Sequence, residues 1–154
     1  MSPRAGMEIR GLKEAQKDME RIVKDLHGRP MLDAMRDATM AVQRDAKRLA
    51  PVDTGALRSS ITPEVKSEND TLVGVVGSNL IYAPFVELGT RPHWPPIASL
   101  TTWARRHGTS AYVVARAIAT RGTKAVKYLE RAFQQNAQYI HRKLEQAADK
   151  IMGV

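Results

Sequence analysis

The stretch that decides the fold reads Ala50-Pro51-Val52-Asp53-Thr54-Gly55 and lies between a helical pattern and a strand pattern. Pro51 ends the preceding helix, because its ring disfavours helical backbone at the residue before it. Asp53 and Thr54 can hydrogen-bond to nearby backbone, and Gly55 tolerates a positive φ. We therefore predict a structural turn at Asp53, Thr54 and Gly55 that launches a sheet.

Two amphipathic helices are predicted before this turn, over residues 8–26 and 31–49, with the Gly28-Arg29-Pro30 break between them. The apolar stripe of the first helix comprises Ile9, Leu12, Ala15, Met19, Ile22 and Leu26. The stripe of the second comprises Leu32, Met35, Thr39, Val42, Ala46 and Leu49. Both stripes approximate a seven-residue repeat, which suits helix-on-helix packing. We expect the segment 1–30 to project from the body.

A β-hairpin is predicted after the turn. Residues 57–66 read as extended, with Leu57, Ser59 and Ile61 alternating, and residues 71–77 are rich in β-branched side chains. Glu68-Asn69-Asp70 is a turn signal between them. The sequence therefore predicts a hairpin of residues 61–66 with residues 71–77.

The remainder of the chain reads as helical. We predict a short helix over residues 80–88 ending at Gly89, then helices over 96–107, 110–120 and 124–151. Inward positions of the 96–107 helix are Ile97, Leu100, Trp103 and Ala104. The stripe of the last helix comprises Val126, Leu129, Phe133, Ile140, Leu144 and Ile151. The expected fold class is α+β, in which long N-terminal and C-terminal helices pack with shorter helices against a small antiparallel β-sheet.

Length and composition limit the class of protein. The 154 residues fit a single domain, and 43% hydrophobic residues argue against a disordered chain. Without cysteine the chain has no disulfides, thiolate nucleophiles or Cys-based zinc sites. The sequence predicts no signal peptide and no membrane span.

The positive charge lies in the C-terminal part. Residues 1–90 hold 13 Lys/Arg and 13 Asp/Glu, whereas residues 91–154 hold 11 Lys/Arg and 3 Asp/Glu. A polyanion such as DNA is one explanation, and a solvated basic helix is the other. The candidate DNA-facing residues are Arg105, Arg106, Arg116 and Lys124. Sequence-specific recognition is not expected, because the segment has no helix-turn-helix pattern.

The strongest enzymatic signal is Asp53-Thr54-Gly55-Ala56, which is similar to the signature of dimeric aspartic proteases. In those enzymes the motif follows a hydrophobic strand in an almost all-β protein, whereas here it follows a basic helix end. We therefore expect no catalytic residues. The four histidines lack partners at metal-ligand spacing, and there is no Gly-rich phosphate loop, so no metal and no cofactor are expected.

Three stretches together resemble the gp-ten-like tail-component family of siphophages, a neck or tail-completion family. The first is Ala50-Pro51-Val52-Asp53-Thr54-Gly55-Ala56-Leu57-Arg58-Ser59-Ser60-Ile61. The second is Val75-Val76-Gly77-Ser78 with Tyr82-Ala83-Pro84-Phe85-Val86-Glu87-Leu88-Gly89-Thr90. The third is Arg121-Gly122-Thr123-Lys124 with Tyr128-Leu129 and Ala132-Phe133. Ala125 and Val126 depart from a frequent proline of the family, so we expect the last helix to start earlier or run straighter.

The resemblance implies a structural virion protein that joins the portal-connector complex to the tail. It implies a homo-oligomeric ring, six-fold first and twelve-fold second, with neighbouring connector and tail proteins as partners and genomic DNA in its lumen. A monomer that assembles only on its partner is an alternative. The implied location is the virion neck, after assembly in the host cytoplasm.

The candidate interface of such a ring comprises Tyr82, Phe85, Glu87, Arg91 and Trp94. A competing interpretation places Tyr82 and Phe85 in the core. Glu87 is expected to pair with an arginine of its own chain or of the next subunit. Two other functions are weighed against the ring. The first is a non-specific DNA-binding protein, favoured by the charge asymmetry, and the second is the dimeric protease using Asp53.

Overall fold

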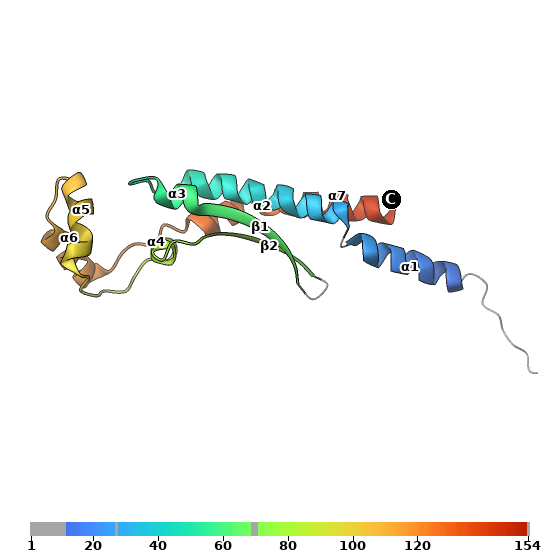
Figure 1. Ribbon diagram of the computed structural model, residues 1–154, viewed down its shortest axis with the longest axis horizontal. Coiled ribbons are helices and arrows are strands. Elements are labelled where there is room, and N and C mark those ends of the chain that lie inside the picture. Colours follow the sequence, from blue (N-terminus) through green and yellow to red (C-terminus); the bar gives the residue numbers. More distant parts are fainter. Residues whose placement is uncertain (1–11, 27, 69–70, 154) are drawn as a thin grey trace, which may run out of the picture. The chain divides into compact units, whose positions relative to one another are not determined.

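The computed structural model describes residues 12–26, 28–68 and 71–153, and this part of the chain is mostly helical (Figure 1). Its elements follow in the order α1 (Leu12–Leu26), α2 (Arg29–Leu49), α3 (Ala56–Ser60), β1 (Ile61–Glu68), β2 (Thr71–Ser78), α4 (Ala83–Leu88), α5 (Ile97–Arg106), α6 (Ala111–Arg121) and α7 (Tyr128–Met152). The long helices α2 and α7 pack together, and β1 and β2 form a two-stranded antiparallel sheet. The predicted α+β class is thereby confirmed. Of the helices described, none has the length and apolarity that crossing a membrane requires.

The chain divides into two compact units. The first unit comprises residues 1–39, 64–75 and 137–154, and the second unit comprises residues 40–63 and 76–136. Helices α2 and α7 and the hairpin contribute residues to both. The single domain over 1–154 and the projecting segment 1–30 stay predictions.

In the first unit, α2 and α7 meet through small side chains. Ala34 and Ala38 on α2 and Ala147 on α7 are buried, and small side chains let two helix axes approach closely. At the edge of this contact, Lys143 Nζ lies 3.0 Å from Asp37 Oδ2. The two helices are therefore joined by alanine packing with an ion pair at the rim.

Strand β2 approaches α2 closely at Gly74. A Cβ at that position would lie 2.7 Å from Thr39 Cγ2 and 3.1 Å from Met35 Cε. Thr39 is buried, and its hydroxyl donates to the Met35 carbonyl at 3.0 Å, so its polar atom is satisfied inside the helix. A glycine is required where the strand lies this near the helix.

The core of the second unit is built from the other halves of α2 and α7. Ala46, Tyr128 and Ala132 are fully buried. Asn136 is also buried, and its Nδ2 donates to Asp45 Oδ2 at 2.7 Å. Spacing by four residues places Tyr128, Ala132 and Asn136 on one face of α7. That face differs from the predicted stripe, because Phe133 is 59% exposed.

The predicted extended segment 57–66 is wrong at its beginning. Residues Ala56–Ser60 form the short helix α3, and only from Ile61 is the backbone a strand. The Ser59 and Ser60 hydroxyls donate to the carbonyls of Ala56 and Leu57 at 2.9 and 2.8 Å, which stabilises a helical turn. The alternation of Leu57, Ser59 and Ile61 is therefore not the alternation of a strand. The serines stabilise a helical turn before the strand begins.

The hairpin itself is confirmed, with β1 and β2 as its strands. Its base lies in the second unit, where the Ser60 and Ser78 hydroxyls are 2.7 Å apart and Gln43 Nε2 donates to the Ile61 carbonyl at 2.8 Å. The predicted turn residues Asn69 and Asp70 lie outside the described residues. Long-range hydrogen bonds from α2 and β2 thus fix where the sheet begins.

The last helix begins at Tyr128, later than the predicted Lys124 and contrary to the earlier start expected from Ala125 and Val126. The Val126 amide donates to the Val86 carbonyl at 3.0 Å, so this segment pairs with α4 instead of coiling. Lys127 has a φ of 55°, which marks the change into helix. Tertiary pairing has overridden local helix propensity here.

Two predicted stripes are only partly buried. In α5, Ala104 is buried and Leu100 is half-buried, whereas Ile97 and Trp103 are exposed. In α1, Met19 is exposed. The α1 prediction also included residues 8–11, which lie outside the described part of the chain. These apolar positions face solvent because no described element of their own unit covers them fully.

Candidate assembly surface

Helix α4 is apolar on two sides, and only one of them is buried. Ala83 on the inner side is buried. On the other side Phe85 and Leu88 are 56% and 72% exposed, and Ile81, just before the helix, is 90% exposed. A helix that is hydrophobic all round is normally covered on every side. An exposed apolar patch of this kind marks an interaction site.

We call Ile81, Tyr82, Phe85 and Leu88 the α4 outer face. Their spacing of three and four residues places them along one stripe. Tyr82 is 45% exposed. The interpretation that Tyr82 and Phe85 belong to the core is therefore wrong, because both present a large part of their rings to solvent.

Glu87 points in the other direction and caps helix α7. Its carboxylate accepts the amides of Leu129 and Glu130, each at 2.9 Å. The first amides of a helix have no partner within it, and a negative charge there is favoured by the helix dipole. Within the described part of the chain, this cap stands in place of the expected pairing of Glu87 with an arginine of its own chain, and it fixes α4 against the start of α7. The pairing with an arginine of a neighbouring subunit stays a prediction.

Two Gly-Thr pairs far apart in the sequence bind each other next to this cap. The amide of Thr90 donates to the Thr123 carbonyl at 3.1 Å, and the Thr123 amide donates back to the Thr90 carbonyl at 3.2 Å. Their hydroxyl oxygens are also 3.1 Å apart. We call this antiparallel bridge the stem. It closes a loop that leaves and re-enters the body of the second unit at one point.

The glycines of the stem are required by its geometry. Gly89 and Gly122 have φ values of 71° and 68°. A Cβ on Gly122 would lie 1.9 Å from the Thr90 carbonyl oxygen, and one on Gly89 would lie 2.4 Å from the Thr123 carbonyl oxygen. Each glycine thus leaves room for the backbone of the other pair. The second and third motifs quoted from the sequence meet here in space.

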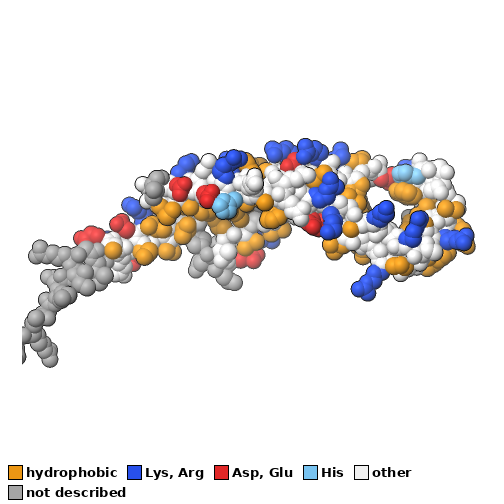
Figure 2. All heavy atoms as spheres, turned by 180° about the vertical axis from the view of Figure 1, so that it is seen from behind, with side chains coloured by type: hydrophobic (Ala, Val, Ile, Leu, Met, Phe, Trp, Pro, Cys, Tyr) orange, Lys and Arg blue, Asp and Glu red, His pale blue; other side chains and the backbone are white. Residues whose placement is uncertain are grey.

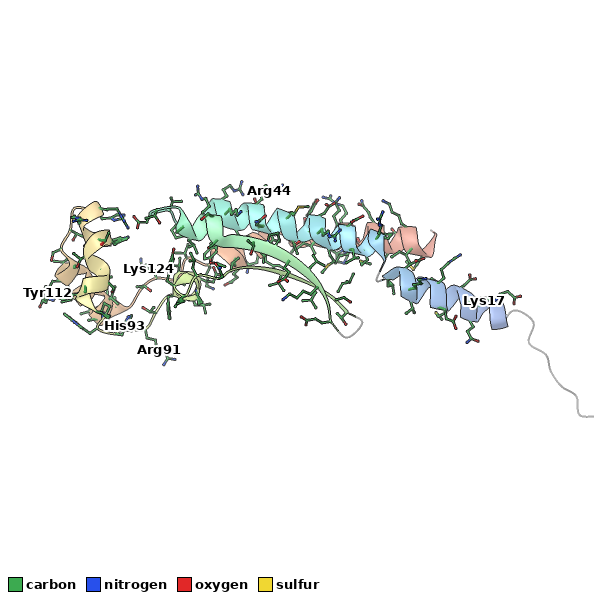
Figure 3. The ribbon with its side chains drawn as sticks, viewed as in Figure 1. Lys17, Arg44, Arg91, His93, Tyr112 and Lys124 are labelled. Atoms are coloured by element: carbon green, nitrogen blue, oxygen red, sulfur yellow. The ribbon has the colours of Figure 1, made fainter. Side chains whose placement is uncertain are left out.

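The residues between the two sides of the stem, 91–121, form what we call the basic arm. Helices α5 and α6 pack against each other within it. The incoming loop is held to α6 by the edge-to-face contact of Trp94 with Tyr112, whose ring centroids are 5.9 Å apart. The His93 amide also donates to the Ile118 carbonyl at 3.4 Å. Figure 3 labels Arg91, His93, Tyr112 and Lys124 around the stem and the arm.

The predicted turn is linked to the basic arm by an ion pair. The Arg106 guanidinium binds both carboxylate oxygens of Asp53, with Nε 3.2 Å from Oδ1. Gly55 has a φ of 84°, and the Thr54 hydroxyl accepts the Ala56 amide at 3.4 Å. Asp53 is thus held by an arginine, and Arg106 is neutralised, unlike the other candidate DNA-facing residues.

A family model described as "Bacteriophage HK97-gp10, putative tail-component" matches residues 13–89, half of the chain. The chain belongs to this phage tail-component family. No curated protein and no solved structure matches it.

Family membership makes the chain a structural virion protein of the phage tail and neck region. A structural tail component has a non-enzymatic role. The matched segment contains the turn, the hairpin and α4, and it ends at Gly89, the first glycine of the stem. The basic arm follows the matched segment.

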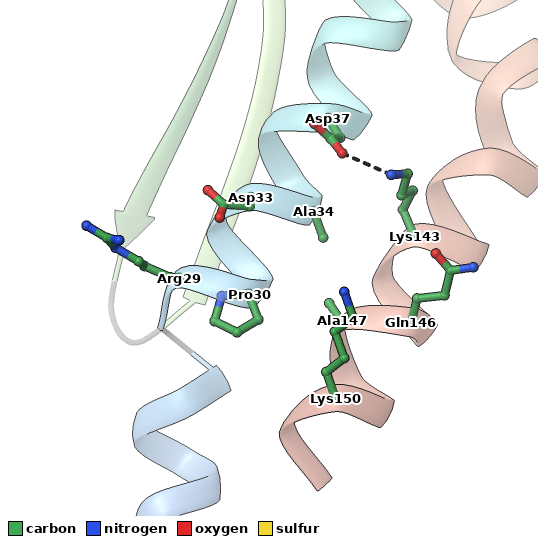
Figure 4. Close-up of a pocket in the computed structure, with 9 residues that line it drawn as sticks. All are labelled: Arg29, Pro30, Asp33, Ala34, Asp37, Lys143, Gln146, Ala147 and Lys150. Carbon is green, nitrogen blue, oxygen red and sulfur yellow. Dashed lines mark hydrogen bonds and ion pairs between the residues drawn. The ribbon is translucent and has the colours of Figure 1, made fainter. Parts of the chain in front are cut away.

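One hollow of this tail-component protein lies in the first unit, between the start of α2 and the end of α7 (Figure 4). Its lining alternates cations with carboxylates and small side chains, namely Arg29, Pro30, Asp33, Ala34, Asp37, Lys143, Gln146, Ala147 and Lys150. Hydrogen bonding to Asp37 raises the pKa of Lys143. Within residues 12–26, 28–68 and 71–153, no three His, Cys, Asp or Glu side chains form a group that could hold a metal. The hollow is a groove between helix ends that is lined by both cations and carboxylates.

Sequence reasoning missed two features of the site. The first is the cap by Glu87, which joins residues 42 and 43 positions apart. The second is Tyr128, which is fully buried with a hydroxyl that makes no hydrogen bond to any described residue. Burial raises the pKa of Tyr128, and the negative charge of Glu87 adds to that rise. The sequence signal available for both was the pair of Gly-Thr motifs that brings α4 to the start of α7.

Proposed function

We propose that the chain is a ring-forming subunit at the head–tail junction and that DNA passes through the ring. The observation that carries this proposal is the α4 outer face, where Ile81, Phe85 and Leu88 are each more than half exposed. Apolar burial drives most protein association, and a monomer rarely leaves such a helix uncovered. A second copy of the chain would cover it.

A closed ring requires a head-to-tail interface between neighbouring subunits. In a closed ring each subunit presents two different surfaces, and the same contact repeats until rotation closes it. The α4 outer face is one of these surfaces. Trp94 and Arg91, which follow the stem directly, extend it with residue types that are enriched at interfaces. Glu87 serves this surface indirectly, because it holds α4 against α7.

Replacing Phe85 and Leu88 together by serine tests this proposal. We expect the double variant to keep its helical circular dichroism spectrum and to elute as a monomer, because both side chains are exposed in the isolated chain. The matched control replaces Met19 and Met152, two exposed apolar residues of the first unit, by serine. The control should assemble as the natural chain does. Equal assembly of the double variant and the natural chain would overturn the proposed interface.

A second candidate function is non-specific DNA binding without a ring. It is favoured by one observation: the second unit holds 12 Lys/Arg and 4 Asp/Glu, and the first unit holds 12 of each. A monomer whose affinity for DNA falls steeply with salt would support it. The protease alternative has no comparable support, since Asp53 binds Arg106.

A further inference from the structure

The basic arm has an unusual charge composition. Residues 91–121 contain five arginines and no lysine, aspartate, glutamate, asparagine or glutamine. Guanidinium groups bind phosphate oxygens through two parallel hydrogen bonds and are weakly hydrated. Asparagine and glutamine are the residues that read adenine edges, and they are missing from this segment. The composition therefore fits a phosphate backbone and does not fit the reading of adenine, although arginine can also bind a guanine edge.

The stem gathers two of these arginines and one lysine that follows the arm. Arg91 follows Thr90, and Arg121 and Lys124 lie on either side of Gly122-Thr123, so pairing of the two threonines brings all three backbones together. A Cβ on Gly122 would be 2.8 Å from the Arg91 carbonyl carbon. The nearby carboxylate of Glu87 is engaged by the amides of α7. No described carboxylate lies within ion-pair distance of these three cations.

The other arginines of the arm lie on its helices. Arg105 is near the end of α5 and Arg116 is within α6, and both are exposed. Arg106 is the exception, because Asp53 holds it. Figure 2 shows Lys and Arg side chains spread over the visible surface of this part of the molecule. Four cations, Arg105, Arg116, Arg121 and Lys124, are thus available to DNA, whereas Arg91 belongs to the proposed ring interface and Arg106 anchors the arm.

We propose that the basic arm binds the phosphate backbone of duplex DNA without reading its sequence. The inference rests on the proposed function, because a subunit in the DNA path meets this polyanion. An acidic protein is the less favoured partner. The cations are distributed over the stem, α5 and α6, whereas a protein interface gathers its charges in a rim around an apolar centre. Distributed contacts to phosphates fix a protein on DNA and carry no sequence information.

The test measures binding of the full-length chain to a fluorescein-labelled DNA duplex by anisotropy at several salt concentrations. The arm variant replaces Arg105, Arg116, Arg121 and Lys124 by glutamine. Each phosphate contact contributes about 0.9 to the slope of log affinity against log salt. We therefore expect the slope of the arm variant to fall by about 3.6.

The matched control replaces four exposed cations of the first unit, Lys17, Lys24, Arg29 and Arg142, by glutamine. It removes the same charge, and its slope should stay close to that of the natural chain. Equal losses in both variants would overturn the proposal, because net charge alone would then explain binding. Binding of poly-glutamate as tightly as DNA would also overturn it, in favour of an acidic protein partner.

A second variant, Asp53→Asn, should have the opposite effect on the slope of log affinity against log salt. It releases Arg106, so the salt slope should rise by up to about 0.9, and a slope that falls would contradict the assignment of Arg106 as a neutralised anchor. Particle mass is measured on the same variants. An arm variant that assembles normally but loses DNA affinity supports the basic arm as the DNA-binding surface. A natural chain that binds DNA through the arm but stays monomeric would contradict only the ring.

Discussion

The two units of the chain handle charge differently. The first unit has equal numbers of acidic and basic residues, and its cations form ion pairs such as Lys143–Asp37, Lys66–Glu64 and Arg36–Asp33. The second unit has 12 Lys/Arg against 4 Asp/Glu and carries the α4 outer face and the basic arm. In the first unit the charges balance in number, and four of its cations, Arg21, Arg36, Lys66 and Lys143, form ion pairs with carboxylates of the same unit. The second unit has a net positive charge and an exposed apolar surface on α4.

The units also differ in how their segments are joined. In the first unit the long helices meet through alanines, whereas the second unit depends on backbone pairing at the stem and on the Glu87 cap. Substitutions can distinguish packing through alanines from pairing through the backbone. We expect substitutions at the stem glycines of the second unit to lower the free energy of unfolding most. Substitutions in surface ion pairs of the first unit should lower it least.

The largest effect is expected for Gly122→Ala. The new Cβ would meet the Thr90 carbonyl oxygen at a backbone φ of 68°, so clash and strain act together. We expect a loss of about 3 kcal/mol or more in the free energy of unfolding, measured by urea denaturation. Gly55→Ala is the control, because its φ is 84° but no atom lies within 4 Å of its Cβ. It should cost about 1–2 kcal/mol. Equal losses would show that the stem is not crowded.

The next effect is expected for Glu87→Ala, which leaves two amides at the start of α7 without their acceptor. The loss should be about 1–2 kcal/mol by urea denaturation. Glu130→Ala removes an equal charge from the first turn of the same helix, where the Glu130 carboxylate pairs with Lys127 and accepts a hydrogen bond from Gln134, both at the surface. That control should change stability by a few tenths of a kcal/mol, about the value of an exposed helix pair. A comparable loss in both variants would contradict the cap.

Tyr128→Phe is expected to stabilise the protein. The buried hydroxyl makes no hydrogen bond in the described structure, so removing it should gain about 1 kcal/mol. Burial and Glu87 raise the Tyr128 pKa, so the neutral phenol is favoured in the fold. The stability that this shift contributes is present below about pH 10 and is lost as pH rises through the folded pKa.

Thermal unfolding at neutral pH and above about pH 10 measures both parts of the Tyr128 prediction. The natural chain should lose stability between the two conditions, and Tyr128→Phe should lose less. Tyr112→Phe, at a half-exposed ring, is the control and should follow the natural chain. A destabilised Tyr128→Phe variant would mean that the hydroxyl has a partner.

The smallest effect is expected for Asp37→Asn in the first unit. Lys143 and Asp37 form a half-buried pair at the rim of the helix contact, where solvent screens the charges and the pair contributes little. Hydrogen bonding to Asp37 raises the Lys143 pKa, so the contribution is present below the usual lysine pKa and is lost as pH rises beyond it. The urea midpoint should fall slightly at low salt and not at high salt. A large fall in the urea midpoint that does not depend on salt would contradict the expectation that substitutions in surface pairs of the first unit have small effects on stability.

Local signals were enough to predict most helix ends and the hairpin. Pro51, Gly89 and Gly122 lie where the sequence placed breaks, because proline and glycine act through their own backbone. What could not be predicted depends on residues far apart in the chain. The late start of α7 follows from pairing of Val126 with Val86, and the neutralisation of Arg106 follows from Asp53. For the same reason Phe133 was assigned to the core and lies outside it.

The central claim is that the chain closes into a ring, and native mass spectrometry of the purified chain tests it directly. The monomer has a mass of 17.1 kDa. We predict one closed particle at six or twelve times that mass, dispersed to the monomer by Phe85→Ser with Leu88→Ser. A monomer or dimer at every concentration, or an open series of sizes, would contradict the account.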